Sequence, residues 1–138
     1  MTLFVDTSVW SLAFRRDAES SMPETDYLQK ALLDGDLIVT TGLVLQELLQ
    51  GFNGPKAAEQ LIERFADIPL LSPTRETHIA AANLRNHCRR NGVQAGTVDA
   101  LIARLCIEND IQLLTTDQDF RHIARFSKLR VMAFKPQS

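Results

Sequence analysis

The sequence has few of the features on which several classes of protein depend. Its two cysteines, Cys88 and Cys106, lie 18 positions apart and form no CxxC pair. We therefore predict two reduced thiols in a cytosolic enzyme, not a disulfide framework. No apolar run is longer than four residues, so the sequence predicts no membrane-spanning helix. No basic segment precedes the first apolar run at Leu3–Val5, so no signal peptide is predicted either.

The 138 residues have the composition of one globular domain, which we expect to span residues 1–138. Hydrophobic residues make up 45% and charged residues 23%, which argues against a disordered or fibrous chain. The net charge of −2 is unevenly distributed: residues 1–69 carry 11 acids and 5 bases, whereas residues 70–138 carry 6 acids and 10 bases. A basic second half is compatible with a polyanionic partner, although many ordinary enzymes share it.

Short apolar segments alternate with segments of helical spacing along the chain. Five of them are typical of buried strands: residues 3–5, 37–40, 68–71, 111–115 and 130–134. Pro69 marks the third as a weak or edge strand. Apolar residues recur at helical spacing after Pro23, after Pro55, from Ile79 to Cys88 and after Thr97. This alternation predicts an α/β fold, with a five-stranded, mainly parallel sheet flanked by helices on both faces.

Two aspartates directly follow predicted strands. Asp6 follows the first strand and Asp117 follows the fourth. Sheets of this kind place their functional sites beyond the carboxyl ends of the strands, so both residues are site candidates. The alternative is that each only caps the helix that begins there, where an acid is favoured by the helix dipole.

Two more acids strengthen the case for a site. Glu47 is the only charged residue between Asp36 and Lys56 and has leucines on most sides, although a solvent-exposed helix face would also explain it. Asp99 falls in the first turn of a predicted helix, where the dipole alone would account for an acid.

Four acids from four separate segments can converge on one crevice of this architecture. Crowded carboxylates repel one another, and a bound divalent cation would remove that conflict. Ligands that are all oxygen suit Mg²⁺ or Mn²⁺, and the scattered His78, His87 and His122 offer no zinc spacing. A partly hydrated Mg²⁺ held by carboxylates suits the hydrolysis of phosphodiesters.

These residues lie in a pattern that resembles the PIN-domain nucleases and, among them, the VapC-type toxins of toxin–antitoxin modules. The matching segments are Phe4-Val5-Asp6-Thr7-Ser8, Glu47 after the second strand, Val98-Asp99-Ala100-Leu101-Ile102-Ala103 and Leu113-Leu114-Thr115-Thr116-Asp117-Gln118-Asp119-Phe120. Each segment is a weak signal alone, but their order and spacing together are specific. The resemblance covers essentially the whole chain.

The resemblance implies a PIN-like three-layer sandwich and a Mg²⁺-dependent endoribonuclease. It maps Asp6, Glu47, Asp99 and Asp117 onto the catalytic acids of the family. It implies metal ligands at Asp6, Asp99 and Asp117, and also at Asp119, which matches an acid that some members of the family have. By the same analogy, supporting hydroxyls come from Thr7, Ser8 and Thr116. It also implies an RNA substrate, a homodimer and a cognate antitoxin whose tail covers the acidic groove.

An acidic site needs nearby cations if it is to accept a polyanion. Arg85, Arg89 and Arg121 are the candidate RNA contacts, and solvated surface arginines are the alternative for each. Trp10 and Phe14 could stack bases, but we interpret them as core or interface residues. His122 could act as a base, although a surface histidine is the simpler interpretation.

Two other functions remain open at this point. One is a catalytically silent PIN-like domain that acts only by binding, although such a domain has no need of a repulsive acidic cluster. The other is a receiver-like Mg²⁺-binding signalling domain. A receiver needs an aspartate at the end of its middle strand, where this sequence has Leu71-Ser72-Pro73, so this alternative is poor.

Overall fold

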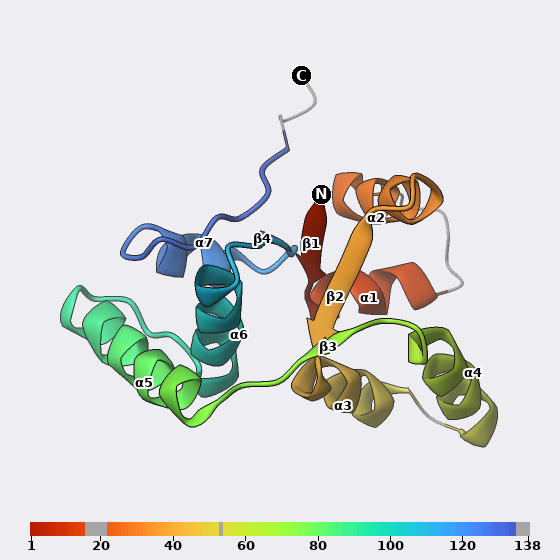
Figure 1. Ribbon diagram of the computed structural model, residues 1–138, viewed down its shortest axis with the longest axis horizontal. Coiled ribbons are helices and arrows are strands. Elements are labelled where there is room, and N and C mark those ends of the chain that lie inside the picture. Colours follow the sequence, from red (N-terminus) through yellow and green to blue (C-terminus); the bar gives the residue numbers. More distant parts are fainter. Residues whose placement is uncertain (16–21, 53, 135–138) are drawn as a thin grey trace.

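The computed structural model describes residues 1–15, 22–52 and 54–134 of the chain. Its sheet contains β1 (Thr2–Val5), β2 (Leu37–Thr41), β3 (Leu70–Leu71) and β4 (Gln112–Leu114). The strands run in the order β3-β2-β1-β4, and every neighbouring pair is parallel (Figure 1). The prediction of a parallel α/β sheet is therefore confirmed. The two-residue strand β3 follows Pro69 and lies at the edge of the sheet, which confirms the prediction of a weak or edge strand there.

The register of the central strands aligns their carboxyl ends. Phe4 is paired with Val39 of β2 and with Leu113 of β4, and Val5 is paired with Leu114. The Asp6 N–H donates to the Leu114 carbonyl at 3.1 Å, which extends the ladder by one residue. Asp6 is consequently placed beside the residues that follow β4, because parallel neighbours end at the same edge.

The prediction of a fifth strand over residues 130–134 is wrong about its length, because only one residue of this segment pairs with the sheet. Its pairing is a single bridge between Val131 and Leu113, made by hydrogen bonds of 2.9 and 2.8 Å through Arg130 and Met132. Beyond Met132 the chain leaves β4, and the ring of Phe134 packs on Tyr27 with 5.9 Å between centroids. This aromatic contact with a helix replaces further sheet pairing.

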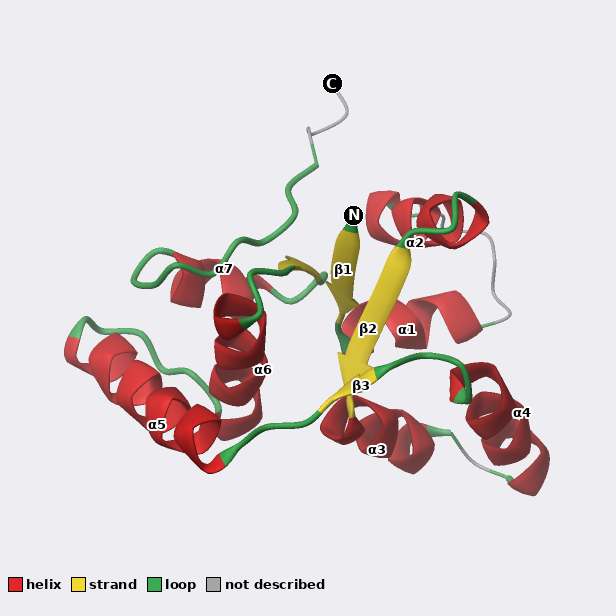
Figure 2. Ribbon diagram, viewed as in Figure 1, coloured by secondary structure: helices red, strands yellow, loops and turns green. Residues whose placement is uncertain are grey.

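Seven helices are described, and they include every segment that has helical spacing in the sequence. They are α1 (Thr7–Phe14), α2 (Pro23–Leu33), α3 (Gly42–Gly51), α4 (Pro55–Phe65), α5 (Arg75–Arg90), α6 (Thr97–Glu108) and α7 (Gln118–Ala124). Figure 2 shows α5, α6 and α7 on one side of the strands and α1, α2 and α4 on the other. This arrangement confirms the predicted three layers. Within the described residues, no helix combines the length and apolarity needed to cross a bilayer.

The two layers of helices meet the sheet through a continuous core. Leu3, Phe4 and Val5 of β1 are fully buried because this strand is covered on both faces. Trp10 is a core residue, as predicted, and its indole N–H donates to the Val5 carbonyl at 3.1 Å. Its ring packs against Phe14 and Phe65, so Trp10 is not a free stacking platform, whereas Phe14 is half-buried.

We predict that Phe120→Ala lowers the free energy of unfolding by about 3–5 kcal/mol, because this ring is fully buried and its removal leaves a cavity. Urea denaturation measures the loss. Ile79→Ala, at a side chain that is 56% exposed, is the control and should change the free energy by roughly 0.5 kcal/mol or less. Equal losses in the two variants would contradict the packing described here.

Candidate metal centre

The four acids singled out in the sequence come from four elements that meet at the carboxyl edge of the sheet. Asp6 lies between β1 and α1, and Asp117 lies between β4 and α7. Asp99 lies in the first turn of α6, and Glu47 lies in α3. Asp6 and Asp117 each cap the helix that follows, so the capping interpretation is also correct. Asp6 and Asp117 therefore both cap a helix and belong to the acidic cluster.

Asp6 is held in place by hydroxyl groups. Its side chain is 5% exposed, and its Oδ2 accepts hydrogen bonds from the Ser8 Oγ and the Thr115 Oγ1, both at 2.8 Å. The Ser8 backbone N–H adds a longer contact of 3.4 Å to the same oxygen. Burial raises the pKa of Asp6 above its usual value, although these hydrogen bonds oppose the shift.

Thr115 is a supporting residue that the sequence analysis missed. Its buried hydroxyl donates to Asp6 and also accepts from the Asp117 N–H at 3.0 Å, so one side chain joins two of the acids. The neighbouring Thr116, which the resemblance selected, contributes its backbone N–H to the Ser8 Oγ at 3.0 Å. A threonine directly after a buried strand and two positions before an aspartate is the signal that could have identified Thr115.

Asp99, Asp117 and Asp119 form the tightest acidic group. Each offers a carboxylate oxygen within 4.8 Å of those of the other two. Asp99 and Asp117 are half-buried, whereas Asp119 is exposed. The Asp119 N–H donates to the Asp117 Oδ1 at 2.9 Å, which orients the Asp117 side chain at the start of α7.

The electrostatics of this group favour a cation. Burial is the largest cause that raises the pKa of Asp99 to about 6. The remaining rise comes from neighbouring carboxylates, in decreasing order Asp117, Asp6, Asp119 and Glu47. A divalent ion would offset this repulsion, and an all-oxygen donor set suits Mg²⁺ or Mn²⁺. The residues present therefore fit a divalent cation.

Glu47 is at the site but is not buried as its apolar neighbours suggested. Val44 and Leu48 form the buried side of α3, and Glu47 is exposed on another side of the helix. Its Oε1 accepts from the Thr7 Oγ1 at 2.8 Å. The two hydroxyls after Asp6 thus serve different acids, since Thr7 contacts Glu47 and Ser8 contacts Asp6.

The candidate RNA contacts are in different environments. The Arg85 Nε donates to the Ala95 carbonyl at 2.9 Å, so this side chain secures the segment that leads into α6. Arg89 is exposed and donates to the Asn86 Oδ1 at 2.9 Å. Arg121 is half-buried on α7, two residues beyond Asp119.

Cys88 and Cys106 are both free thiols that are buried in the protein. Burial raises the pKa of each thiol.

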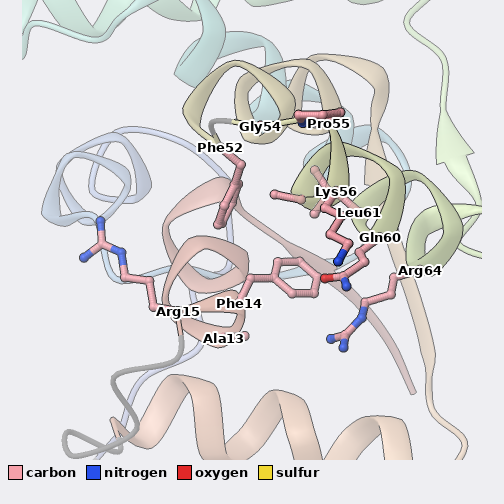
Figure 3. Close-up of a pocket in the computed structure, with 11 residues that line it drawn as sticks. Ala13, Phe14, Arg15, Phe52, Gly54, Pro55, Lys56, Gln60, Leu61 and Arg64 are labelled. Atoms are coloured by element: carbon pink, nitrogen blue, oxygen red, sulfur yellow. The ribbon is translucent and has the colours of Figure 1, made fainter.

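A separate apolar groove lies at the far end of α1 from Asp6 (Figure 3). It has a volume of about 690 Å³ between the ends of α1 and α3 and the first turns of α4. Phe14 and Phe52 are among its apolar residues, and its cations are Arg15, Lys56 and Arg64. The Arg64 guanidinium lies 5.4 Å from the centre of the Phe14 ring.

Comparison with known proteins supplies the context for this geometry. Residues 3–126 match the family profile described as the PIN domain. Among solved structures, a chain of VapBC2 from Rickettsia felis bound to a promoter DNA fragment is 18% identical, with a TM-score of 0.76 over 98% of this chain and 100% of that one. A chain of VapBC-1 from nontypeable Haemophilus influenzae is 18% identical, with a TM-score of 0.74 over 96% and 97%.

A third similar structure is VapC20 from Mycobacterium tuberculosis, described as a toxin that cleaves the sarcin–ricin loop. It is 23% identical, with a TM-score of 0.67 over 93% of this chain and 98% of that one. No curated protein sequence matches the chain. At these identities the structures establish a shared fold.

We predict that Asp99→Asn stabilises the metal-free protein at neutral pH. The folded protein holds the pKa of Asp99 at about 6, above its value of about 3.9 in unfolded chains, so ionisation disfavours folding. The wild type should lose stability as the pH rises from about 4 to about 6, and the variant should lose less. Thermal melts in excess chelator at pH 7.5 should show a higher Tm for Asp99→Asn.

The same melts near pH 4 are the control, because there the wild-type carboxyl is protonated and the advantage should disappear. A variant that is less stable than the wild type at pH 7.5 would contradict the proposed repulsion.

We predict that Thr115→Val costs about 1–3 kcal/mol of folding free energy, because the Asp117 N–H loses its acceptor and Asp6 loses a donor. Affinity for Mn²⁺, measured by calorimetric titration, should fall as well. Thr115→Ser keeps the hydroxyl and should restore the affinity. Equal affinities for the valine and serine variants would rule out this positioning role.

Proposed function

Since the chain belongs to the PIN-domain family, we propose that it is a divalent-metal-dependent endoribonuclease, the VapC-type toxin of a toxin–antitoxin module. The observation that carries the proposal is the convergence of Asp99, Asp117 and Asp119 within 4.8 Å at the carboxyl edge of the sheet. The position of Asp6 supports it, because its charge contributes to the raised pKa of Asp99. The proposed catalytic set is Asp6, Glu47, Asp99 and Asp117.

The proposed metal is Mg²⁺, with Mn²⁺ as a substitute, held by Asp99, Asp117 and Asp119 with Asp6 beside them. A divalent ion at such a site acidifies a water and stabilises negative charge on a phosphodiester and its leaving oxygen. The chain supplies the fixed geometry that this requires. Ser8 and Thr115 orient Asp6, Thr115 also orients the start of α7, and Thr7 orients Glu47.

RNA is the proposed substrate. The proposal is supported by the family and by the basic second half of the chain, which can compensate for the acids when a polyanion approaches. The similar VapC20 structure is described as that of a toxin that cleaves the sarcin–ricin loop. Arg89 and Arg121 are candidate phosphate contacts, whereas Arg85 acts through the backbone of Ala95 and so also positions α6.

The proposed protein partner is an antitoxin. Two of the similar structures are VapBC assemblies, which supports a partner of that kind. The apolar groove beside Phe14 and Phe52 suits a segment that carries apolar and acidic side chains, because cations line its apolar surface (Figure 3). We also propose that the protein forms a homodimer. Its proposed location is the cytoplasm, because both the RNA substrate and the antitoxin would be found there.

The two alternatives differ in how the structure bears on them. A receiver needs a phosphate-accepting aspartate after its third strand, and β3 instead ends at Leu71 and is followed by Ser72. A silent binding domain has no use for an acidic group that burial and repulsion make costly. The cleavage assay below separates it from a nuclease.

We predict that the wild type cuts RNA into discrete fragments only when a divalent metal is supplied. Total tRNA and ribosomal RNA are incubated with the protein in Mg²⁺, in Mn²⁺ and in excess chelator, and the products are resolved by gel electrophoresis. Asp99→Asn and Asp6→Asn should lower the rate by roughly a hundredfold or more, since each changes a carboxylate of the metal centre. Both variants should keep the circular dichroism spectrum of the wild type.

Cleavage that persists in chelator or in Asp99→Asn would point to a contaminating ribonuclease and remove the support for this site. Intact RNA in every metal, with a folded wild type, would favour the silent binding domain.

A further inference from the structure

A hollow outside the acidic group lies against one of its members. It has a volume of about 470 Å³ between the loop of residues 91–94 and α7. Its lining includes Gln94 from the loop, Asp119 and His122 from α7, and Arg125 and Phe126 just after that helix. Figure 1 shows the loop that leaves α5 running below α7. Asp119 belongs to both, so the hollow lies next to the candidate metal centre.

Both walls of the hollow are fixed by backbone hydrogen bonds. Gly92 adopts a φ of +81° as α5 ends, and the Val93 N–H donates to the Cys88 carbonyl at 2.9 Å. On the other wall, the Phe126 N–H donates to the Ile123 carbonyl at 3.1 Å, and Ile123 is fully buried. The side chains that face the hollow are therefore presented by a preformed frame.

Arg125 supplies the positive charge in the lining of the hollow. The segments that contribute its two walls are basic in sequence: residues 120–134 contain four Lys and Arg residues and no acid, and residues 77–98 contain three Arg residues and no acid. Arg104 and Arg130 elsewhere in the protein are paired with acids at 3.4 and 2.9 Å. Arg125 has no such pairing within the described residues, and its guanidinium lies 5.8 Å from the centre of the Phe126 ring.

We propose that this hollow holds the nucleotide of the RNA strand that adjoins the phosphodiester at the acidic centre. Arg125 contacts a backbone phosphate, Phe126 provides an apolar floor, and His122 and Gln94 offer hydrogen bonds to the ribose or base. The Arg125 cation, the Phe126 ring and the Gln94 amide, next to the proposed metal ligand Asp119, suit a nucleotide better than a peptide. Proteins bind single-stranded RNA through its phosphates and through stacking on its flat bases. The inference rests on the proposed function and adds the path of the strand.

The test compares Arg125→Gln with Lys128→Gln. Lys128 is an exposed cation three residues further along, and it lines the neighbouring cleft with His87 and Arg104 instead of this hollow. Binding of a fluorescein-labelled single-stranded oligoribonucleotide of mixed sequence is measured by anisotropy with Mg²⁺ present, each variant being combined with Asp99→Asn so that cleavage is suppressed. Affinity for Mn²⁺ is measured in parallel, and Arg125→Lys tests whether positive charge alone suffices.

We expect Arg125→Gln to weaken RNA binding roughly tenfold, as for the loss of one charged hydrogen bond. The slope of log affinity against log salt should become shallower by about 0.7, the value for one phosphate contact on a single strand. The affinity for Mn²⁺ should not change, Lys128→Gln should bind RNA as the wild type does, and Arg125→Lys should recover part of the loss. In cleavage assays KM should rise more than kcat falls.

Equal RNA affinities for Arg125→Gln and Lys128→Gln would overturn the inference even if the wild type cleaves RNA, because the strand would then follow another path. A wild type that neither binds nor cleaves RNA would overturn the proposed function, and this inference with it.

Discussion

Repulsion among carboxylates at the carboxyl edge of the sheet is the interaction on which the site depends. The acids cannot relieve it by moving apart, because each is attached to an element that the core holds in place. Asp99 is followed directly by Ala100, Leu101, Ile102 and Ala103, all buried, so α6 cannot turn its first turn away from the sheet. Protonation or a bound cation is then the available relief. Burial, and after it the neighbouring carboxylates, raises the pKa of Asp99 to about 6, so this carboxyl is protonated more readily than a free one. A fold that retains this conflict is organised for an ion.

The hydroxyl groups around Asp6 explain how such an arrangement stays folded. The Ser8 and Thr115 hydroxyls satisfy a buried carboxylate that burial alone would disfavour, and the same contacts begin α1 and connect β1 to the segment after β4. The hydroxyl groups that stabilise the fold here are therefore the same ones that orient a carboxylate of the proposed metal centre. Thr115 donates to one acid and accepts from the backbone of another, so its side chain adds a link between Asp6 and Asp117 to the backbone hydrogen bond from Asp6 to Leu114.

Much of this arrangement is predictable from the sequence, since acids directly after apolar strands of a parallel sheet must meet at one edge. What the sequence did not show depends on orientation or on distant segments. The leucines near Glu47 suggested burial, but helical geometry places Val44 and Leu48 on the buried side and Glu47 on another. Residues 130–134 have the composition of a strand, yet Phe134 packs on Tyr27 and leaves one bridge to β4. Thr115 was overlooked because its two partners are recognisable only when β1 and β4 lie side by side.

The placement of cations follows from the same electrostatic constraint. A polyanion approaching an acidic edge is repelled until metal and cations compensate, and cations already paired with acids contribute little to that compensation. Arg104 and Arg130 are paired in this way, whereas the exposed Arg125 lies 5.8 Å from the centre of the Phe126 ring and lines a hollow that Asp119 also lines. In the proposed nucleotide site, the position of Arg125 would determine how far a bound phosphate lies from the acidic centre, and therefore which phosphodiester along the strand would lie over the carboxylates.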